Sequence, residues 1–486
     1  MSINSKPVRP LGNREIVSYA LTNSGQTMIY GIITTYLLLF MTDYLYINAA
    51  IAGLILSITR VFDALNDPLM GAILDKTHSR WGKCRPYMLA TPIPVALLTI
   101  LLFAPFKFGT TGTIVYASVA YLLFTVAYTA NDIPYWSMSA MITTDTNERT
   151  KVVTSTRIIG GLGSGLAVGT FWFLNKIFAD TGQDKRMSFF LTVLIFCILG
   201  AILMLQGFFG TRERAKTTVQ KDEKFFDSLK LVPKSKALVL NLIAGVLMSV
   251  MMVGTTALTT YFTKWNLKEV FPDMESNTIM SIFVPALGIL PGIAMFVGLL
   301  GAPALIKRYE KKNLLLAGCV LGIVSNIAFY FVGYSNIILF VLGRVLSCLP
   351  LGVWSAVTTI MIGDSVDEIE HKTGRRVEGA CFSLLTFISK FQNGVNVAII
   401  GFLLSAAGYI GELNPDIEQQ SPSALKMIFI LVTLIPAIGF LLMGIPFLFY
   451  DLSKKRHKAI LAELEDRNAK KEKESDSLAF DLDWYK

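Results

Sequence analysis

The sequence is poor in charged residues. Of its 486 residues only 16% are Asp, Glu, Lys or Arg, whereas 53% are hydrophobic, and a soluble domain carries about 25% charged residues. A chain this apolar has too little polar surface to stay in water, so the composition predicts that the lipid bilayer is its solvent. The length then indicates a bundle of spans of about 20 residues each and not several soluble domains.

Histidine and cysteine are scarce as well. The three histidines, His78, His371 and His457, all fall outside the apolar runs, so we expect no Ser/His or metal pair of the kind that an intramembrane hydrolase needs. The five cysteines form no CxxC or Cys/His cluster, which argues against a disulfide framework or a zinc site. Because no signalling domain is recognisable either, we expect neither an enzyme nor a receptor, and no cofactor.

The net charge of +9 would suggest a nucleic-acid partner in a soluble protein, but here the basic residues gather in loops between apolar runs. Loops rich in Lys and Arg stay in the cytoplasm. We therefore expect no nucleic acid and predict a multi-pass protein of the bacterial inner membrane with both termini cytoplasmic. Residues 1–16 are polar and lead into the first span, which we expect to serve as an uncleaved insertion signal.

Twelve apolar runs predict an all-α membrane protein with twelve transmembrane helices. They lie at roughly 15–45, 49–75, 86–107, 113–142, 153–177, 188–210, 237–264, 277–306, 313–333, 336–363, 378–408 and 424–450. The basic loop 211–236 divides them into an N-terminal six-helix half (1–210) and a C-terminal six-helix half (237–450), and a charged tail (451–486) follows. Trp136-Ser137 and Trp354-Ser355 form a faint repeat near the ends of spans four and ten. Two parallel halves are the plan of major-facilitator transporters.

Two carboxylates in the second span are the main candidates for cation binding. Asp63 and Asp67 are four residues apart and project from one helix face, with the Asn66 amide oxygen beside them. A carboxylate at mid-membrane costs at least about 2.5–3.5 kcal/mol, and two together repel unless a cation or a proton joins them. The alternative is structural: Asp63 pairs with Arg60 for helix packing, and Asp67 serves the bend before Pro68.

The fourth span presents a mixed polar and aromatic face. Tyr128, Thr129 and Asp132 lie on one side of the expected helix, and Trp136 follows one turn later. A few placed polar groups beside an aromatic platform suit a sugar, and Asp132 could serve cation and substrate together. The alternative is a hydrogen-bonded helix contact at the Pro134 kink, with Trp136 as a packing residue.

Two basic residues lie inside the later spans. Lys390 in the eleventh span is expensive at that depth, and we expect it to neutralise the carboxylates or to donate to substrate hydroxyls, with snorkelling to the interface as the alternative. Arg344 in the tenth span suits a structural ion pair equally well. Arg157, near the edge of span five, is placed to reach substrate.

A charged turn follows the second span. Asp75, Arg80 and Arg85 surround Gly82 there, and an acidic residue at a helix C-terminus needs a basic partner because the helix dipole disfavours it. We expect these residues to act as a gate: an ion pair between the halves would hold the cytoplasmic side shut. The weaker alternative is a binding site.

Three motifs resemble a known family. FDALNDP at 62–68, RWGKCRP at 80–86 and NDIPYWS at 131–137 are similar to those of the glycoside-pentoside-hexuronide:cation symporters, whose best-known members are the melibiose permeases, and the likeness covers nearly the whole chain. It implies a major-facilitator fold and sugar uptake driven by Na+, Li+ or H+. The implied cation residues, with Na+ expected as the metal at the three aspartates, are Asp63, Asn66, Asp67, Thr129 and Asp132. The implied sugar residues are Tyr128, Asp132, Trp136, Arg157, Thr386 and Lys390.

The chain departs from the melibiose permeases in the first span. Those carriers have a basic-acidic pair where this chain has Gln26-Thr27, so we expect Gln26 and Thr27 to bind a different hydroxyl pattern or an acidic sugar.

We therefore predict a cation-coupled sugar symporter that works by alternating access as a monomer in the bilayer, with sugar and monovalent cation as its partners. A lipid or lysolipid carrier of the same fold is the alternative.

Overall fold

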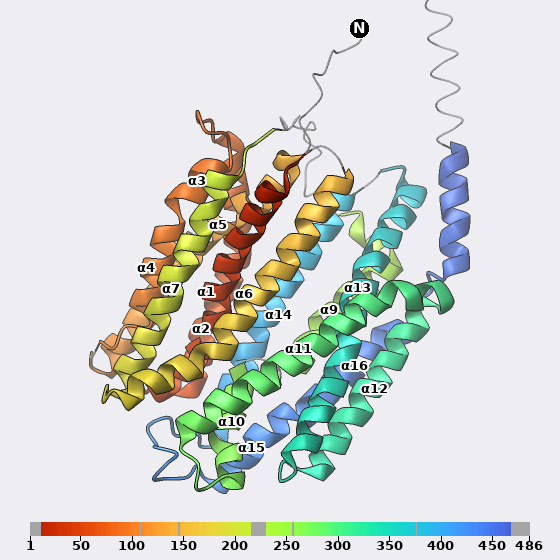
Figure 1. Ribbon diagram of the computed structural model, residues 1–486. Helices are drawn as coiled ribbons and strands as arrows, with labels where there is room; N and C mark the ends of the chain where they lie inside the picture. The colour runs from red at the N-terminus through yellow and green to blue at the C-terminus, as the bar shows by residue number, and fades with distance from the viewer. Residues whose placement is uncertain are drawn as a thin grey trace, which may run out of the picture.

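The computed structural model describes residues 11–467 apart from 107, 144–145, 215–229, 255–256 and 376, and its regular elements are helices (Figure 1). The N-terminal half contains α1 (Asn13–Asp43), α2 (Ala49–Lys76), α3 (Arg85–Ala90), α4 (Pro92–Leu102), α5 (Thr110–Ile142), α6 (Thr146–Asp180) and α7 (Lys185–Gly210). The C-terminal half contains η1 (Val232–Lys234), α9 (Lys236–Met252), α10 (Ala257–Val270), α11 (Ser276–Arg308), α12 (Lys311–Val332), α13 (Ile337–Thr373), α14 (Glu378–Ala406), α15 (Pro422–Val432) and α16 (Leu434–Leu448).

Eleven helices of the described chain are long and apolar enough to cross a membrane. They coincide with the expected spans, three of which are interrupted. The third is split into α3 and α4 at Thr91, before Pro92, and α4 alone is too short to be counted. Twelve spans thus remain a prediction, whereas the all-helical membrane fold is confirmed.

The two halves meet on one side of the molecule and diverge on the other. Toward the end where α1 begins, the helices of the two halves spread apart; we call this the terminal side (Figure 1). On the opposite side, the closed side, α2 crosses α14, α6 crosses α11, and α1 meets α10. Small residues permit the α2–α14 crossing, because a Cβ on Gly401 would collide with the Ala49 carbonyl oxygen.

A buried arginine joins two helix breaks in the C-terminal half. Arg344, 3% exposed, donates hydrogen bonds to the carbonyl oxygens of Gly254 (2.7 Å), just beyond α9, and Val432 (3.4 Å), the last residue of α15. Its positive charge thus lies at two helix C-termini, which carry partial negative charge. The hypothesis of an ion pair for Arg344 is wrong, since no carboxylate in the described part of the chain lies within ion-pair distance.

The charged tail begins with a helix at 454–467, in agreement with the expected surface helix. It packs on the end of α13, where Arg456 pairs with Glu368 at 2.9 Å and His457 with Asp367 at 3.0 Å. Residues 468–486, like most of the loop 211–236, lie outside the described residues.

Candidate cation and substrate site

The two expected carboxylates of α2 converge on a lysine of the other half. The Lys390 ammonium of α14 lies 3.1 Å from Asp63 Oδ2 and 2.5 Å from Asp67 Oδ2. These three side chains are 20%, 6% and 17% exposed, so the charges meet well away from bulk solvent. Lys390 therefore neutralises the carboxylates, as one of the two sequence expectations has it, and does not snorkel.

The neighbourhood of Asp63 confirms part of the α2–α5 contact. Thr129 Oγ1 of α5 donates to Asp63 Oδ1 at 2.7 Å, so Asp63 uses both oxygens. Asp67 Oδ1 is buried and has no hydrogen-bond partner in the described chain. A buried carboxylate oxygen without a donor is costly, so the site has room for one further positive group. Asn66 is half-buried, and no contact of its amide is recorded.

Asp132 does not join the other two carboxylates in one cage. Its Oδ1 accepts a hydrogen bond from Gln26 Nε2 of α1 at 2.6 Å, and it interacts electrostatically with Lys390. Within the described residues no group of three or more His, Cys, Asp or Glu has the spacing to hold a metal ion. The Na+ site of Asp63, Asp67 and Asp132 therefore stays a prediction.

Sequence reasoning missed an aromatic and cationic cluster beside Asp132. Tyr128 of α5 stacks on Tyr30 of α1 with ring centroids 4.9 Å apart, and Arg60 of α2 donates to the Tyr30 hydroxyl at 2.6 Å. The alternative that pairs Asp63 with Arg60 is thus wrong. Tyr30 could have been found, because it lies four residues after Gln26 on the same helix face.

The remaining expected sugar residues take different positions. Arg157 is exposed and its guanidinium lies 5.9 Å from the half-buried Trp136 ring. Thr386 lies one turn before Lys390 on α14. Thr27, by contrast, donates to the Asn23 and Gly160 carbonyl oxygens at 2.8 and 2.6 Å. That hydroxyl links α1 to α6, whereas the Gln26 amide faces Asp132 and keeps an unpaired, buried Oε1.

The three gating candidates all find partners within the N-terminal half. Asp75 pairs with Lys83 at 2.6 Å. Arg80 lies over the Trp81 ring, and Arg85 donates to the Phe208 carbonyl oxygen at 2.8 Å. No ion pair of the described residues joins the halves on the terminal side, which is the side where they are apart. The gating role therefore stays a prediction for a state in which this side closes.

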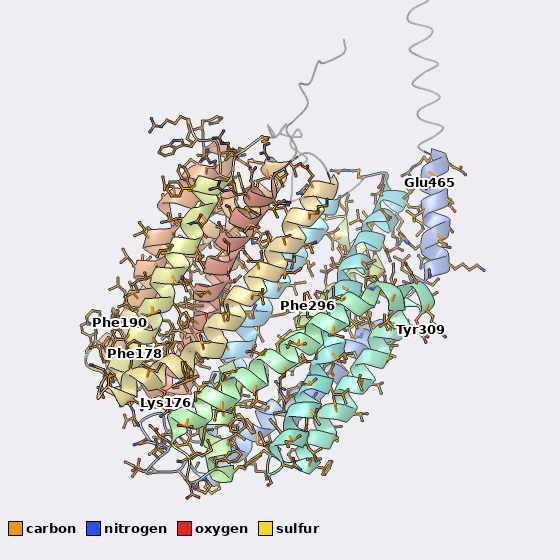
Figure 2. All side chains as sticks on the ribbon, viewed as in Figure 1. Lys176, Phe178, Phe190, Phe296, Tyr309 and Glu465 are labelled. Carbon is orange, nitrogen blue, oxygen red and sulfur yellow. The ribbon has the colours of Figure 1, made fainter. Side chains whose placement is uncertain are left out.

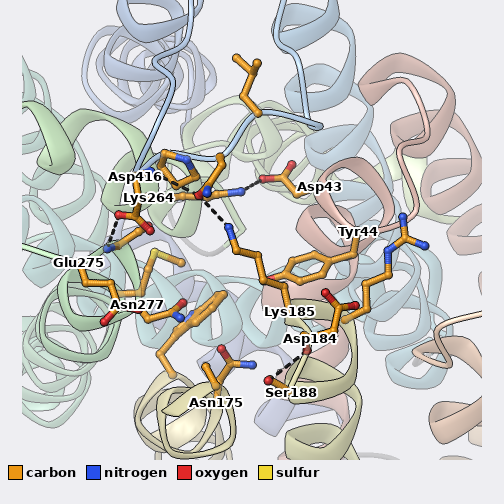
Figure 3. A pocket seen from close by; sticks show the side chains of 18 of the residues that line it. Asp43, Tyr44, Asn175, Asp184, Lys185, Ser188, Lys264, Glu275, Asn277 and Asp416 are labelled. Carbon is orange, nitrogen blue, oxygen red and sulfur yellow. Dashed lines mark hydrogen bonds and ion pairs between the residues drawn. The ribbon is translucent and has the colours of Figure 1, made fainter. Parts of the chain in front are cut away.

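Polar contacts between the halves lie instead on the closed side, and these the sequence did not reveal. Asp43, at the end of α1, has a side chain with 0% exposure and pairs with Lys264 of α10. Its two oxygens also accept from the Tyr409 hydroxyl, at 2.9 Å each (Figure 3). Burial, and then the charge of Asp43, raise the pKa of the Tyr409 hydroxyl well above its ordinary value, so this phenol remains a donor. Further along, Lys268 pairs with Asp416 at 3.0 Å and Lys176 with Glu275 at 3.2 Å.

Comparison with known proteins assigns this site to a family. The sequence profile of the family described as MFS/sugar transport protein matches residues 18–454. The chain belongs to this family. Within the MFS/sugar transport family it is 31% identical to the isoprimeverose transporter of Lactiplantibacillus pentosus, over 94% of this chain and 92% of that one. It is 25% identical to the glucuronide carrier protein homolog of Escherichia coli K12, with coverage of 93% and 96%. The resemblance to the glycoside-pentoside-hexuronide:cation symporters is confirmed.

Solved structures agree on the fold. The nucleoside transporter NupG superposes with a TM-score of 0.65 at 15% identity, covering 90% of this chain and 99% of that one. A bacterial homolog of the lysosomal transporter Spinster reaches 0.66 at 14% identity, with coverage of 93% and 99%. The protein is therefore a membrane transporter of the major-facilitator fold and not an enzyme.

Proposed function

We propose that this protein is a secondary active symporter that carries a sugar or glycoside together with Na+ or H+. The observation that supports it most is the contact of Lys390 with Asp63 and Asp67, two acidic side chains on one half and a cation on the other. Buried charges are tolerated only when they are paired. In this state the carboxylates have a tethered cation as partner, so a free cation is needed only when the halves move apart.

This geometry suggests how the cation and the conformational change are coupled. A Na+ ion or a proton that joins Asp63 and Asp67 would replace Lys390 as their counter-charge, and it would free the ammonium to donate to substrate or to Asp132. The unpaired Asp67 Oδ1 provides a first oxygen for that cation. Each ligand then changes the affinity for the other by the same factor, because coupling between two sites is reciprocal.

The orientation follows from charge. The basic loops after α2, α5 and α7 lie on the terminal side, and positive loops favour the cytoplasm. We therefore place both termini in the cytoplasm of the bacterial plasma membrane. The state described here is then open inward and closed outward, and Asp75, Arg80 and Arg85 are proposed to close the inner side in the opposite state.

The substrate is proposed to be a sugar because of the groups around Asp132. Gln26 and Asp132 supply a donor and acceptors, Trp136 supplies an aromatic face, and the exposed Arg157 guanidinium suits a carboxylate on the sugar. The names of the relatives include a transporter of isoprimeverose and a glucuronide carrier, so neutral and acidic glycosides are the compounds to test first.

Uptake into proteoliposomes tests the function. With the purified protein and an inward Na+ or H+ gradient, we expect accumulation of a radiolabelled sugar above equilibrium, and collapse of the gradient by an ionophore should remove it. A panel of neutral glycosides and glucuronides identifies the substrate. Lysolipid flux without any sugar flux would instead establish the lipid carrier, and sugar entry that never exceeds equilibrium would rule out symport.

Gln26 and Thr27 are adjacent but should behave differently. Gln26→Ala removes a group that contacts Asp132 and leaves that carboxylate without a donor, so we expect the KM for the sugar to rise about tenfold, as for loss of one hydrogen bond to a charged group. Thr27→Ala removes only a bond to backbone carbonyls, and its KM should change less than about twofold. Initial rates of uptake against sugar concentration decide this. A larger effect of Thr27→Ala would show that its hydroxyl binds substrate.

A further inference from the structure

A cavity of about 190 Å³ lies on the closed side, above the Asp43–Lys264 ion pair (Figure 3). Its wall comes from both halves: Asn175 and Lys185 belong to the N-terminal half, and Asn277 and Asn414 belong to the C-terminal half. The cavity is thus complete only while this side is closed. It is separate from the site at Lys390, since none of the residues proposed for cation or sugar lines it.

Two unpaired hydrogen-bond donors line this cavity. Trp172 and Asn175 lie three residues apart on α6, and their side chains are 2% and 3% exposed. Trp172 Nε1 and Asn175 Nδ2 have no hydrogen-bond partner in the described chain. Both are N–H donors, so an occupant that satisfies them must present acceptor atoms. A buried donor without a partner costs about 1–3 kcal/mol, which makes an occupant favourable.

A lysine adds positive charge to the same wall. The Lys185 ammonium has one recorded hydrogen bond, to Asn414 Oδ1 at 2.7 Å, and no carboxylate of the described residues lies within ion-pair distance of it. An ammonium has three N–H donors. The lysine therefore offers charge and donors that the protein leaves unused.

The carboxylates around the cavity do not offset this charge. Asp43 pairs with Lys264, Glu275 with Lys176, and Asp416 with Lys268. The two other acidic residues of the lining, Asp184 and Glu412, are exposed, where solvent screens them. The unused groups of the cavity are thus two neutral N–H donors and one cation.

We propose that this cavity binds a small oxyanion, either inorganic or the acid group of a sugar, and that the bound anion holds the closed side shut. Charge-assisted hydrogen bonds from Lys185 and Asn175 would bind it, and Trp172 would add a third donor. Because both halves contribute walls, the anion binds the closed state alone and shifts the population toward it. In the orientation proposed above, the site faces the outside of the cell and slows transport when the anion is abundant there.

Equilibrium binding of radiolabelled sulfate to the purified full-length protein tests this proposal. We expect saturable binding that weakens at least tenfold in Lys185→Gln and in Asn175→Ala, and several-fold in Trp172→Phe, which keeps the ring packing and removes the N–H. Lys176→Gln is the matched control: it removes a lysine of α6 that does not line the cavity, so binding should be unchanged. Asp132→Asn, which alters the proposed sugar site, should also bind sulfate normally.

Competition identifies the source of the anion. Displacement of sulfate by glucuronate but not by glucose in the Asp132→Asn protein would assign the site to acidic sugars, and displacement by neither would assign it to inorganic oxyanions. In transport, external sulfate at constant ionic strength should inhibit uptake by the parent and not by Lys185→Gln. Absence of saturable sulfate binding, or equal binding by the parent, Lys185→Gln and Asn175→Ala, would overturn the proposal.

Discussion

Asp67→Asn is expected to reduce cation-driven sugar accumulation at least about 100-fold. In the present state Lys390 neutralises two carboxylates. With Asp67 replaced, the ammonium balances Asp63 alone, and no negative charge remains to attract a free cation. Removing one member of a buried ion pair typically costs about 3–5 kcal/mol, and each 1.4 kcal/mol is a factor of about ten in an equilibrium constant. The cation site, and with it the coupling, should be lost.

The measurement compares two modes of transport in proteoliposomes. Accumulation against a gradient needs the cation, whereas exchange of internal for external sugar needs only alternation of the loaded carrier. We expect Asp67→Asn to lose the first and to retain part of the second. Asp180→Asn serves as control, because this carboxylate is 58% exposed and pairs with Lys176. Cation-driven accumulation at the parental level by Asp67→Asn would remove Asp67 from the coupling mechanism.

The positions of the helices could be predicted well, but their interruptions could not. The expected span at 277–306 corresponds to α11 at Ser276–Arg308, because a long apolar run has no stable alternative in lipid other than a helix. The breaks after α9 and α15 lie inside uniformly apolar runs, where hydropathy carries no signal. They depend on Arg344, which binds carbonyl oxygens at both from a third helix.

The candidate site shows the same division. The face shared by Asp63 and Asp67 follows from helix geometry, and spacing alone predicted it. The partner of a charge depends on tertiary packing: Lys390 is more than 300 residues away in the chain, and Arg60 binds Tyr30. Asp43 and Lys264 lie at the ends of spans, where charged residues are ordinary, so nothing in the sequence distinguished them from solvated groups.

Asp43→Asn is expected to open the closed side. The Asp43 carboxylate is fully buried and balances Lys264, with Tyr409 and Thr42 as further donors. An asparagine would leave the ammonium buried without a counter-charge, at a cost of about 3–5 kcal/mol that falls only on the state in which this side is closed. A shift of that size changes the ratio of the two states more than about 100-fold. The variant should therefore favour the state open on the far side from the termini, and net uptake should fall about tenfold or more because the return step is impaired.

Spin labels at Gln183 and Glu418, both exposed and on opposite halves, report this opening as a longer distance in pulsed electron resonance. The decisive control is the double variant Asp43→Asn with Lys264→Met. If the unpaired ammonium is what opens the closed side, then removing it should restore much of the short distance, because replacing both members of a buried pair by apolar or neutral groups is often close to neutral. A double variant as open as Asp43→Asn alone would place the effect in the hydrogen bonds from Tyr409 and Thr42 and not in the charge. An unchanged distance in the single variant would show that the other ion pairs, Lys268–Asp416 and Lys176–Glu275, are enough to keep this side closed.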